Sequence, residues 1–360
     1  MLLYLLLYLS CLFYYFSQKQ NPSTGFYVFL AFGIGMAGFR DMIGGYDIYV
    51  YSDVFEHDLK PVIRRNIFEP GFMAYFWLLK QISEAREWMI FVSAVLVLGL
   101  HTYAIRRLSP LFYISFFIYF AKFYLMSFVY IRQGLAMAGV YLAYVFLSQN
   151  KRKWAWLLVL GSCFIHKSAI IVLPFLFIAF RKFTWLQSLL IAASALLVSL
   201  SPLGDFLLGA AVEQVDSAKL AVYADKSGGV NIFYLIEGLL VIILFAIFRF
   251  RLYANQKYRL FANGLFFYGL IIILSLTNAT FVRFAWYFFI FVVLALPAIM
   301  LQIKDLKTRQ LFRLGVFIYY TAVFFRLLLV YDGGDFMPYK SIFQDFDRNG
   351  RWEFMEYRYD

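Results

Sequence analysis

The chain has 360 residues, of which 63% are hydrophobic and only 15% are charged; its mean hydropathy is +0.72 and its formal net charge is +12. Soluble domains are about 45–50% apolar and about 25% charged, so this composition excludes a water-soluble globular protein. We predict an all-α, polytopic membrane protein in which residues 1–360 form one domain. Cys11 and Cys163 both fall inside apolar runs, which favours buried thiols over a disulfide.

Apolar runs along the chain predict about twelve membrane helices, since a spanning helix needs about 20 apolar residues. In chain order they are expected at 1–17, 24–39, 88–105, 109–127, 130–148, 154–166, 169–180, 185–202, 230–248, 260–277, 284–303 and 310–330. The stretch 69–82 is shorter and predicts a re-entrant or interfacial helix. The first run has neither a basic segment before it nor an A-x-A site after it, so we interpret it as a retained helix and not a signal peptide.

The distribution of basic residues predicts how these helices are oriented. The loops on one side hold 16 of the 33 Lys and Arg and one of the 21 acids, a net charge of +15, whereas the rest of the chain sums to −3. The basic groups of that side are Lys19, Arg106–Arg107, Lys151–Lys153, Arg181–Lys182, Arg249–Arg259 and Lys304–Arg313. By the positive-inside rule that side is cytoplasmic. Both termini, the loops 40–68 and 203–229 and the tail 331–360 then lie outside, and the net charge indicates orientation, not nucleic-acid binding.

Four basic side chains are predicted to lie at the outer ends of the helices. Arg132, followed by Gln133, and Arg283 lie at helix N-termini, where free N–H groups and the helix dipole favour anions. A guanidinium there can hold a phosphate with two hydrogen bonds. With Arg40 and Lys167, these residues predict a site for a phosphate or pyrophosphate. The simpler alternative is that each arginine only reaches the lipid headgroups.

Three further outer groups could perform acid–base chemistry. They are Asp47, Glu69 and His166, and the residues alone do not rank them. Gly44–Asp47 is most simply a turn, and His166–Lys167 could be ordinary solvated turn chemistry. Most of the aromatic residues are expected to face lipid, but a few could stack on sugar rings. Our candidates for that role are Tyr46, Tyr51, Tyr287 and Tyr339.

The order of these motifs resembles a known family. "FRDMIGGYDIYVY", "EPGFMAYFWLLK", "RQGLAMAGVYLAYVFLSQNKRKW", "FIHKSAIIVLPF", an arginine before "WYFF" and "MPYKSIF" follow one another between about residues 39 and 343. In this order and spacing they are similar to the EpsG family, which is related to Wzy-type O-antigen and capsule polymerases. Segments 183–229 and 250–260 match nothing in that pattern, as expected if they determine substrate specificity.

The resemblance implies an enzyme of the bacterial inner membrane, similar to C-type membrane glycosyltransferases, with its active site on the periplasmic or outer side. Such polymerases transfer a glycan chain from undecaprenyl pyrophosphate to the next lipid-linked repeat unit. They need no nucleotide sugar, and no cofactor or metal is expected. The implied partners are the lipid-linked donor and acceptor and the membrane lipid, with a chain-length regulator as a further candidate.

Other functions remain open at this point. A transporter of lipid-linked saccharides would use the same arginines but would place charges through the helix interior, where Glu237 and Arg326 are the nearest examples. A membrane acyltransferase could use His166 as its base, and a non-enzymatic assembly subunit would need none of these groups. Only a polymerase would lengthen a glycan without a nucleotide sugar or an acyl donor.

Overall fold

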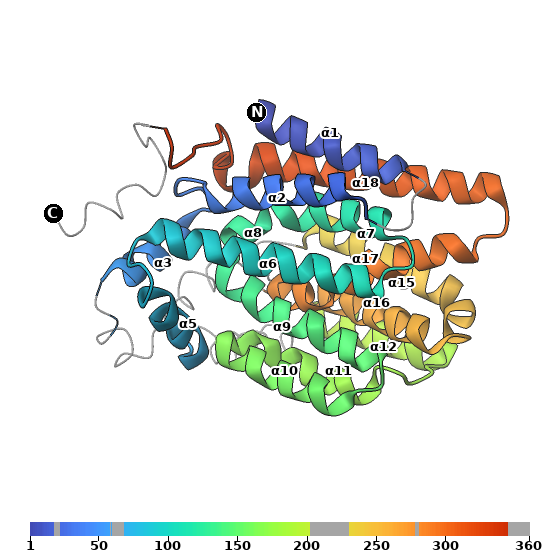
Figure 1. The fold of residues 1–360 in the computed structure, drawn as a ribbon. Helices are drawn as coiled ribbons and strands as arrows, with labels where there is room; N and C mark the ends of the chain where they lie inside the picture. Colours follow the sequence, from blue (N-terminus) through green and yellow to red (C-terminus); the bar gives the residue numbers. More distant parts are fainter. Residues whose placement is uncertain (18–21, 58, 60–67, 202–229, 278–280, 345–360) are drawn as a thin grey trace. The chain divides into compact units, whose positions relative to one another are not determined.

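The computed structural model describes the chain except residues 18–21, 58, 60–67, 202–229, 278–280 and 345–360. The described residues form helices, joined by turns, with one isolated antiparallel bridge between Arg40 and Ser341 (Figure 1). This confirms the all-α prediction. The chain divides into two compact units: unit 1 comprises Met1–Leu142, Leu160–His166 and Asp305–Asp360, and unit 2 comprises Ala143–Val159 and Lys167–Lys304.

Unit 1 contains the N-terminal helices, parts of two helices that continue into unit 2, and the last long helix. In chain order they are α1 (Leu2–Phe16), α2 (Thr24–Gly38), α3 (Tyr46–Glu56), α5 (Pro70–Lys80), α6 (Arg86–Leu108), α7 (Phe112–Tyr119), the π-helix η1 (Phe120–Tyr124), α8 (Met126–Val129), the start of α9 (Ile131–Ser148), the end of α10 (Arg152–Ile165), α18 (Leu306–Val330) and the short η4 (Tyr331–Gly333).

In unit 1 the helices α1 and α18 pair with each other. Figure 1 shows α1 beside α18, and Tyr8 and Thr321 share a 2.6 Å hydrogen bond between these helices. The ring of Tyr8 also stacks on Phe324 at 5.0 Å. Aromatic residues therefore build much of this core, because each buries a large apolar area and a tyrosine hydroxyl still finds a partner there.

Among the described residues, unit 2 contains the remaining parts of α9 and α10 and six further elements. These are the 3₁₀ helix η2 (Lys167–Val172), α11 (Leu173–Ile178), α12 (Trp185–Ser199), α15 (Ile232–Tyr253), α16 (Gln256–Leu274) and α17 (Val282–Gln302). Consecutive helices α15, α16 and α17 pack together. A Cβ on Gly264 would lie only 1.9 Å from the Phe291 ring, so this glycine is what lets α16 and α17 approach closely.

All twelve predicted runs coincide with helical segments, and the short helix predicted at 69–82 is α5. Among the described residues, six helices are long and apolar enough to cross a membrane: α6, α9, α15, α16, α17 and α18. Shorter apolar helices include α1, α2 and α12. The chain is therefore a multi-pass membrane protein, whereas the predicted count of about twelve crossings stays a prediction.

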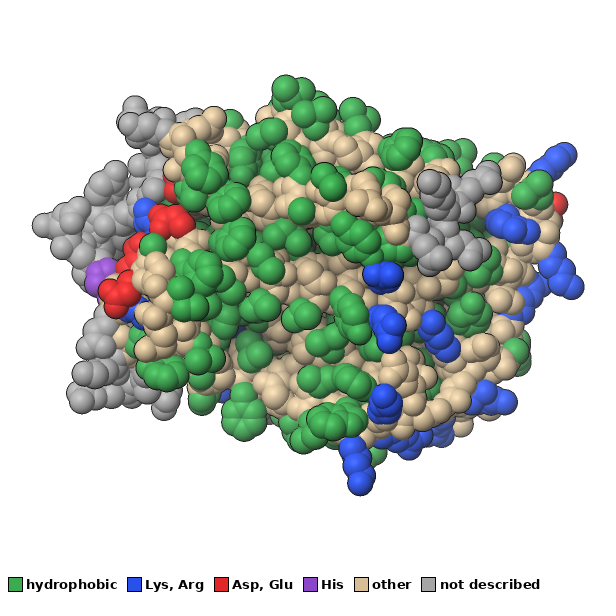
Figure 2. All heavy atoms as spheres, viewed as in Figure 1, with side chains coloured by type: hydrophobic (Ala, Val, Ile, Leu, Met, Phe, Trp, Pro, Cys, Tyr) green, Lys and Arg blue, Asp and Glu red, His purple; other side chains and the backbone are tan. Residues whose placement is uncertain are grey.

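Helix α6 carries opposite charges at its two ends. It begins at Arg86, which forms ion pairs with Glu87 and with Glu56 of α3, and it ends with Arg106 and Arg107. Figure 2 shows acidic side chains gathered near the start of α6 and basic ones toward its end. This is the asymmetry on which the orientation prediction rests, and the orientation itself stays a prediction.

The predicted outer segments contain structure that the sequence did not reveal. Loop 40–68 includes helix α3, so the predicted turn is limited to Gly44 and Gly45, whose φ angles of 143° and 70° suit glycine. The start of the tail folds back as a strap (Asp335–Ile342), in which Lys340 accepts a backbone hydrogen bond from Asp41. Loop 203–229 and the tail beyond residue 344 lie outside the described residues.

One predicted helix contains an irregular turn. The run from α7 to α8 continues through η1, a π-helix at Phe120–Tyr124, with backbone angles that stay helical at Tyr119 and Leu125. Lys122 lies in this turn, and it is a charge inside a predicted membrane helix that the sequence analysis did not single out. A π-turn holds one residue more than a regular turn and is frequent at functional sites.

Candidate active site

The motif Glu69-Pro70-Gly71 starts helix α5 in a defined geometry. Glu69 is the N-cap with extended backbone angles, and Pro70 occupies the first helical position, where its missing N–H costs nothing. The backbone carbonyl of Glu69 accepts hydrogen bonds from the N–H groups of Phe72 and Met73 at 3.0 and 3.1 Å. The backbone of Glu69 is therefore fixed by the helix start, while its carboxylate reaches toward other elements.

Gly71 allows the start of α5 to rest directly on the end of α10. A Cβ on Gly71 would lie 2.7 Å from the carbonyl oxygen of Phe164, which is closer than real Cβ contacts come. Two residues later, the backbone N–H of His166 donates to the Ser162 carbonyl at 2.9 Å and completes the last turn of α10. The close contact at Gly71 thus places Glu69 and His166 beside each other.

The carboxylate of Glu69 bridges Arg132 and His166. Arg132 donates through Nη1 to Oε2 at 2.8 Å, and Nδ1 of His166 lies 3.0 Å from Oε1. The side chains are 12% exposed for Arg132, 9% for His166 and 4% for Glu69. The sequence analysis named all three residues but did not predict that they form one buried cluster, which we call the Glu–Arg–His cluster.

The 3.0 Å contact between His166 and Glu69 bears on the tautomer of the histidine. An ionised carboxylate only accepts hydrogen bonds, so beside an ionised Glu69 the Nδ1–H of His166 is the donor. In a neutral imidazole, Nε2 is then the nitrogen without a proton. This is the arrangement in which a carboxylate orients a histidine base and stabilises its protonated form.

Arg132 adds a positive charge at the start of a helix. It is the second residue of α9, and its guanidinium lies 5.0 Å from the centre of the Phe68 ring. A guanidinium has five donors in a planar fork, and the Nη1 donor of Arg132 binds Glu69. The next residue, Gln133, is buried.

Arg40 lies in a different environment. It is buried, and its guanidinium donates to the backbone carbonyls of Ile43 at 2.8 Å, Phe128 at 2.9 Å and Ala37. Burial lowers the pKa of Arg40 to about 10, which still leaves it protonated at neutral pH. These contacts favour a bracing role between α2 and α8, and a part of Arg40 in anion binding stays a prediction.

The four candidate tyrosines differ in exposure. Tyr51 is buried against Phe68 and Tyr287 is fully buried, as expected for packing residues. Tyr339 donates its hydroxyl to the carbonyl of Met36. Tyr46 is exposed at the first position of α3, next to the half-buried Asp47. Of the four, Tyr46 is thus the most exposed.

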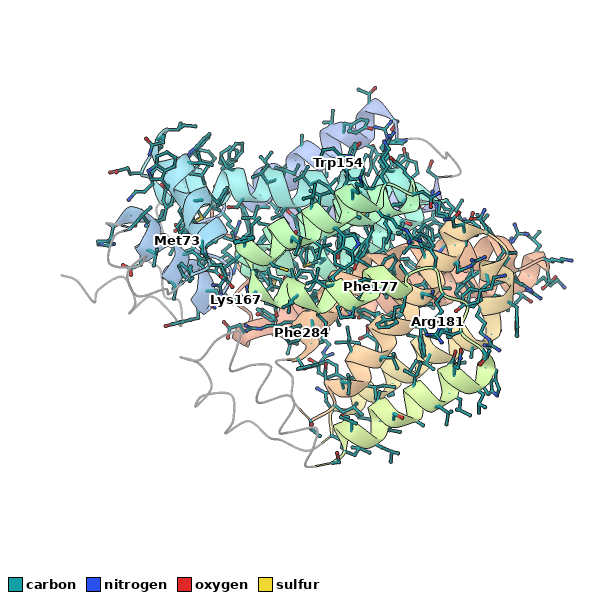
Figure 3. The ribbon with its side chains drawn as sticks, turned by 90° about the horizontal axis from the view of Figure 1, so that it is seen from below. Met73, Trp154, Lys167, Phe177, Arg181 and Phe284 are labelled. Atoms are coloured by element: carbon teal, nitrogen blue, oxygen red, sulfur yellow. The ribbon has the colours of Figure 1, made fainter. Side chains whose placement is uncertain are left out.

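Two predicted cations lie at one end of unit 2. Ser168 and Tyr287 share a 2.8 Å hydrogen bond that joins η2 to α17. Lys167 starts η2 and is exposed, and Arg283 is the second residue of α17. Figure 3 shows Lys167 close to Phe284, the neighbour of Arg283. Lys167 follows His166 directly in the chain.

The sequence analysis missed the role of Asp335. Its Oδ2 accepts hydrogen bonds from the backbone N–H groups of Gly44 and Gly45, both at 2.9 Å. Successive N–H groups in this conformation form a concave anion site, which here is filled by the chain's own carboxylate. The resemblance at "MPYKSIF" was a weak signal for this strap, because it placed a motif in a segment that otherwise resembles a plain tail.

Taken together, these observations define a multi-pass helical membrane protein with a buried Glu–Arg–His cluster where the start of α5 meets the end of α10. The chain belongs to the EpsG family, whose model matches residues 23–341 and whose members are Wzy-like polymerases. No curated protein and no solved structure matches the chain.

Proposed function

We propose that this protein is a polysaccharide polymerase that transfers a glycan chain from a lipid pyrophosphate to the next lipid-linked repeat unit. Family membership supports the polymerase class. The observation that carries the proposed mechanism is the Glu69 carboxylate held between Arg132 and His166. It joins a proton acceptor and a guanidinium in one buried cluster, and glycosyl transfer from a pyrophosphate needs both groups.

In the proposed reaction, a hydroxyl oxygen of the acceptor attacks the anomeric carbon of the donor glycan. The bond from that carbon to the pyrophosphate oxygen breaks, and the electron pair leaves with the lipid pyrophosphate. Nε2 of His166 takes the hydroxyl proton, and Glu69 stabilises the imidazolium that results. Arg132 stabilises the negative charge that develops on the leaving group.

The geometry also supports a ranking of the three acid–base candidates. Both carboxylate oxygens of Glu69 are engaged, one by His166 and one by Arg132, which favours a positioning role for Glu69. His166 is then the proposed base. Asp47, in the first turn of α3, is a candidate for contacts with the acceptor sugar. Lys167 and Arg283 are proposed to bind the pyrophosphate.

The proposal is tested by reconstituting the purified protein with lipid-linked repeat units and following glycan length on a gel. A ladder should form without a nucleotide sugar. His166→Ala should slow elongation by roughly 10²–10⁴, the usual contribution of a positioned acid–base group. His57→Ala is the matched control, because the ring of that histidine is exposed and lies against Asp53, four residues earlier in the chain.

Two outcomes would argue against this function. Absence of a ladder with folded wild-type protein would refute the polymerase itself, and movement of the lipid-linked unit across the bilayer would then indicate a transporter. A ladder that His166→Ala leaves at the rate of His57→Ala would keep the polymerase but refute the proposed base.

A further inference from the structure

Unit 2 contains a pocket whose lining includes none of the candidate site residues discussed above. It has a volume of about 500 Å³, opens to the surface, and lies where the turn between α11 and α12 meets the end of α15. We call it the basic pocket. Lys182 and Arg249 line it, and among its described lining residues none is acidic.

The basic pocket lies at the opposite end of unit 2 from Arg283. Arg251, near the end of α15, donates to the backbone carbonyl of Gln302 at 3.1 Å, and Gln302 is the last residue of α17. Arg283 is at the other end of α17, about 30 Å away at 1.5 Å per helical residue. Figure 3 agrees, since the chain runs from Lys167 through Phe177 to Arg181 as it approaches the pocket.

A buried polar network fixes the wall of the basic pocket. Asn263 donates its amide to the carbonyls of Ala179 and Arg181 at 2.9 and 2.8 Å. Its side-chain oxygen accepts from the Tyr253 hydroxyl at 2.7 Å, and the backbone N–H of Phe183 donates to that hydroxyl. The turn is therefore held in place from inside, so the pocket is preformed.

Arg249 is the central group of the pocket. It is only 3% exposed, its Nη1 donates to the carbonyl of Phe183 at 3.1 Å, and its guanidinium lies 4.3 Å from the Phe250 ring centre. In the described part of the chain, its Nε has no hydrogen-bond partner. Buried donors in proteins are nearly always paired, so this guanidinium keeps hydrogen-bonding capacity beyond its bond to Phe183 within the described residues.

The lining indicates the chemistry of a ligand for this pocket. Lys182 is exposed beside Arg249 and none of the described lining residues is acidic, so the lining favours an anion. Trp185 and Phe250, which also line the pocket, are 54% and 72% exposed, so the ligand has an apolar part as well. The pocket lies at helix ends that the basic residues predict to be cytoplasmic, and basic pockets between membrane helices on that side bind anionic headgroups.

We propose that the basic pocket binds the phosphate of an anionic phospholipid, with Arg249 and Lys182 on the headgroup and Trp185 and Phe250 along its acyl chains. The guanidinium offers the phosphate a two-point contact, and the ammonium adds a second charge. Such a lipid would hold the α11–α12 turn against α15. This site is separate from the glycosyl-transfer chemistry proposed above.

The test uses the full-length protein in phosphatidylcholine nanodiscs that contain increasing fractions of phosphatidylglycerol, with bound lipid counted by native mass spectrometry. Arg249→Gln and Lys182→Gln should each need about tenfold more phosphatidylglycerol for half-maximal occupancy, because charge-assisted hydrogen bonds contribute at least one tenfold step. Arg251→Gln is the matched control, since it removes the same charge from the same helix outside the pocket.

Equal occupancy in the three variants would overturn the proposal. If the buried Arg249→Gln variant does not fold, the exposed Lys182→Gln variant decides the result alone. Inorganic phosphate, added in place of phosphatidylglycerol, should neither bind nor raise the unfolding temperature. Saturation by inorganic phosphate alone would instead indicate a site for a free anion and would also overturn the lipid assignment.

Discussion

Replacing Gly71 by alanine should move Glu69 away from His166 without removing any functional group of the Glu–Arg–His cluster. The new Cβ would lie 2.7 Å from the Phe164 carbonyl oxygen, and ordinary van der Waals contact begins at 3.4 Å. The start of α5 must therefore move away from α10 by about 0.7 Å. A shift of that size along the 3.0 Å hydrogen bond between His166 and Glu69 would stretch it to about 3.7 Å, too long for a hydrogen bond.

The functional effect of this shift can be estimated. A misplacement of about 1 Å can cost about 10²-fold in rate, so Gly71→Ala should slow elongation by roughly 10–10². Gly161→Ala is the matched control: this glycine lies on α10, and a Cβ there would meet nothing within 4 Å in the described structure. That control should keep its activity and gain up to about 1 kcal/mol in helix stability.

The assay is elongation of lipid-linked repeat units by each purified variant, together with its unfolding temperature. The expected pattern is slow elongation in Gly71→Ala at a near-normal unfolding temperature. Wild-type elongation in that variant would refute the reasoning, because it would show that the contact between α5 and α10 does not set the geometry of the cluster.

Three other predictions follow from the same structure. Arg132→Lys should lower elongation by at least about tenfold, because an ammonium cannot hold Glu69 and a pyrophosphate in one plane; elongation at the wild-type rate would show that Arg132 only anchors its helix. Asp335→Asn should lower the free energy of unfolding by about 1–2 kcal/mol through weaker bonds to Gly44 and Gly45, measured by denaturation in detergent. The control variant Glu84→Gln, at an exposed position, should keep its free energy of unfolding. An equal loss in both variants would exclude a specific role for the strap. Impermeant thiol reagents should reach cysteines on the predicted cytoplasmic side only after permeabilisation, and labelling in intact cells would reverse the topology. The positions to test are Ser109, Asn150 and Gln256.

The helices could be predicted because long apolar runs have few other solutions in a bilayer. The structure departs from the prediction where local signals conflict. Helix α3 follows two glycines and is rich in tyrosine, and this composition resembles a loop. The π-turn at Phe120–Tyr124 could not be predicted either, because one additional residue inside an apolar run leaves the run just as apolar.

The members of the candidate site were predictable but their arrangement was not. Glu69 before a proline and His166 after an apolar helix are visible as polar groups at helix ends. Their pairing depends on how α5 packs on α10, across 97 positions of sequence. For Arg40, the local sequence indicates exposure, whereas the structure shows burial. Its neighbour Asp41 suggests a solvated loop, but three backbone carbonyls accept hydrogen bonds from its guanidinium in the interior.

The π-turn has a consequence for how the length of this helix can vary among relatives. A π-turn accommodates its additional residue within one wider turn, so deleting one residue from Phe120–Tyr124 would restore α-helical spacing and leave α8 at nearly the same rotation. The carbonyl and ring of Phe128 would then keep their contacts with Arg40. Relatives are thus expected to tolerate a single-residue deletion within this turn, whereas a deletion in a regular turn of the same helix would rotate the residues beyond it by about 100°.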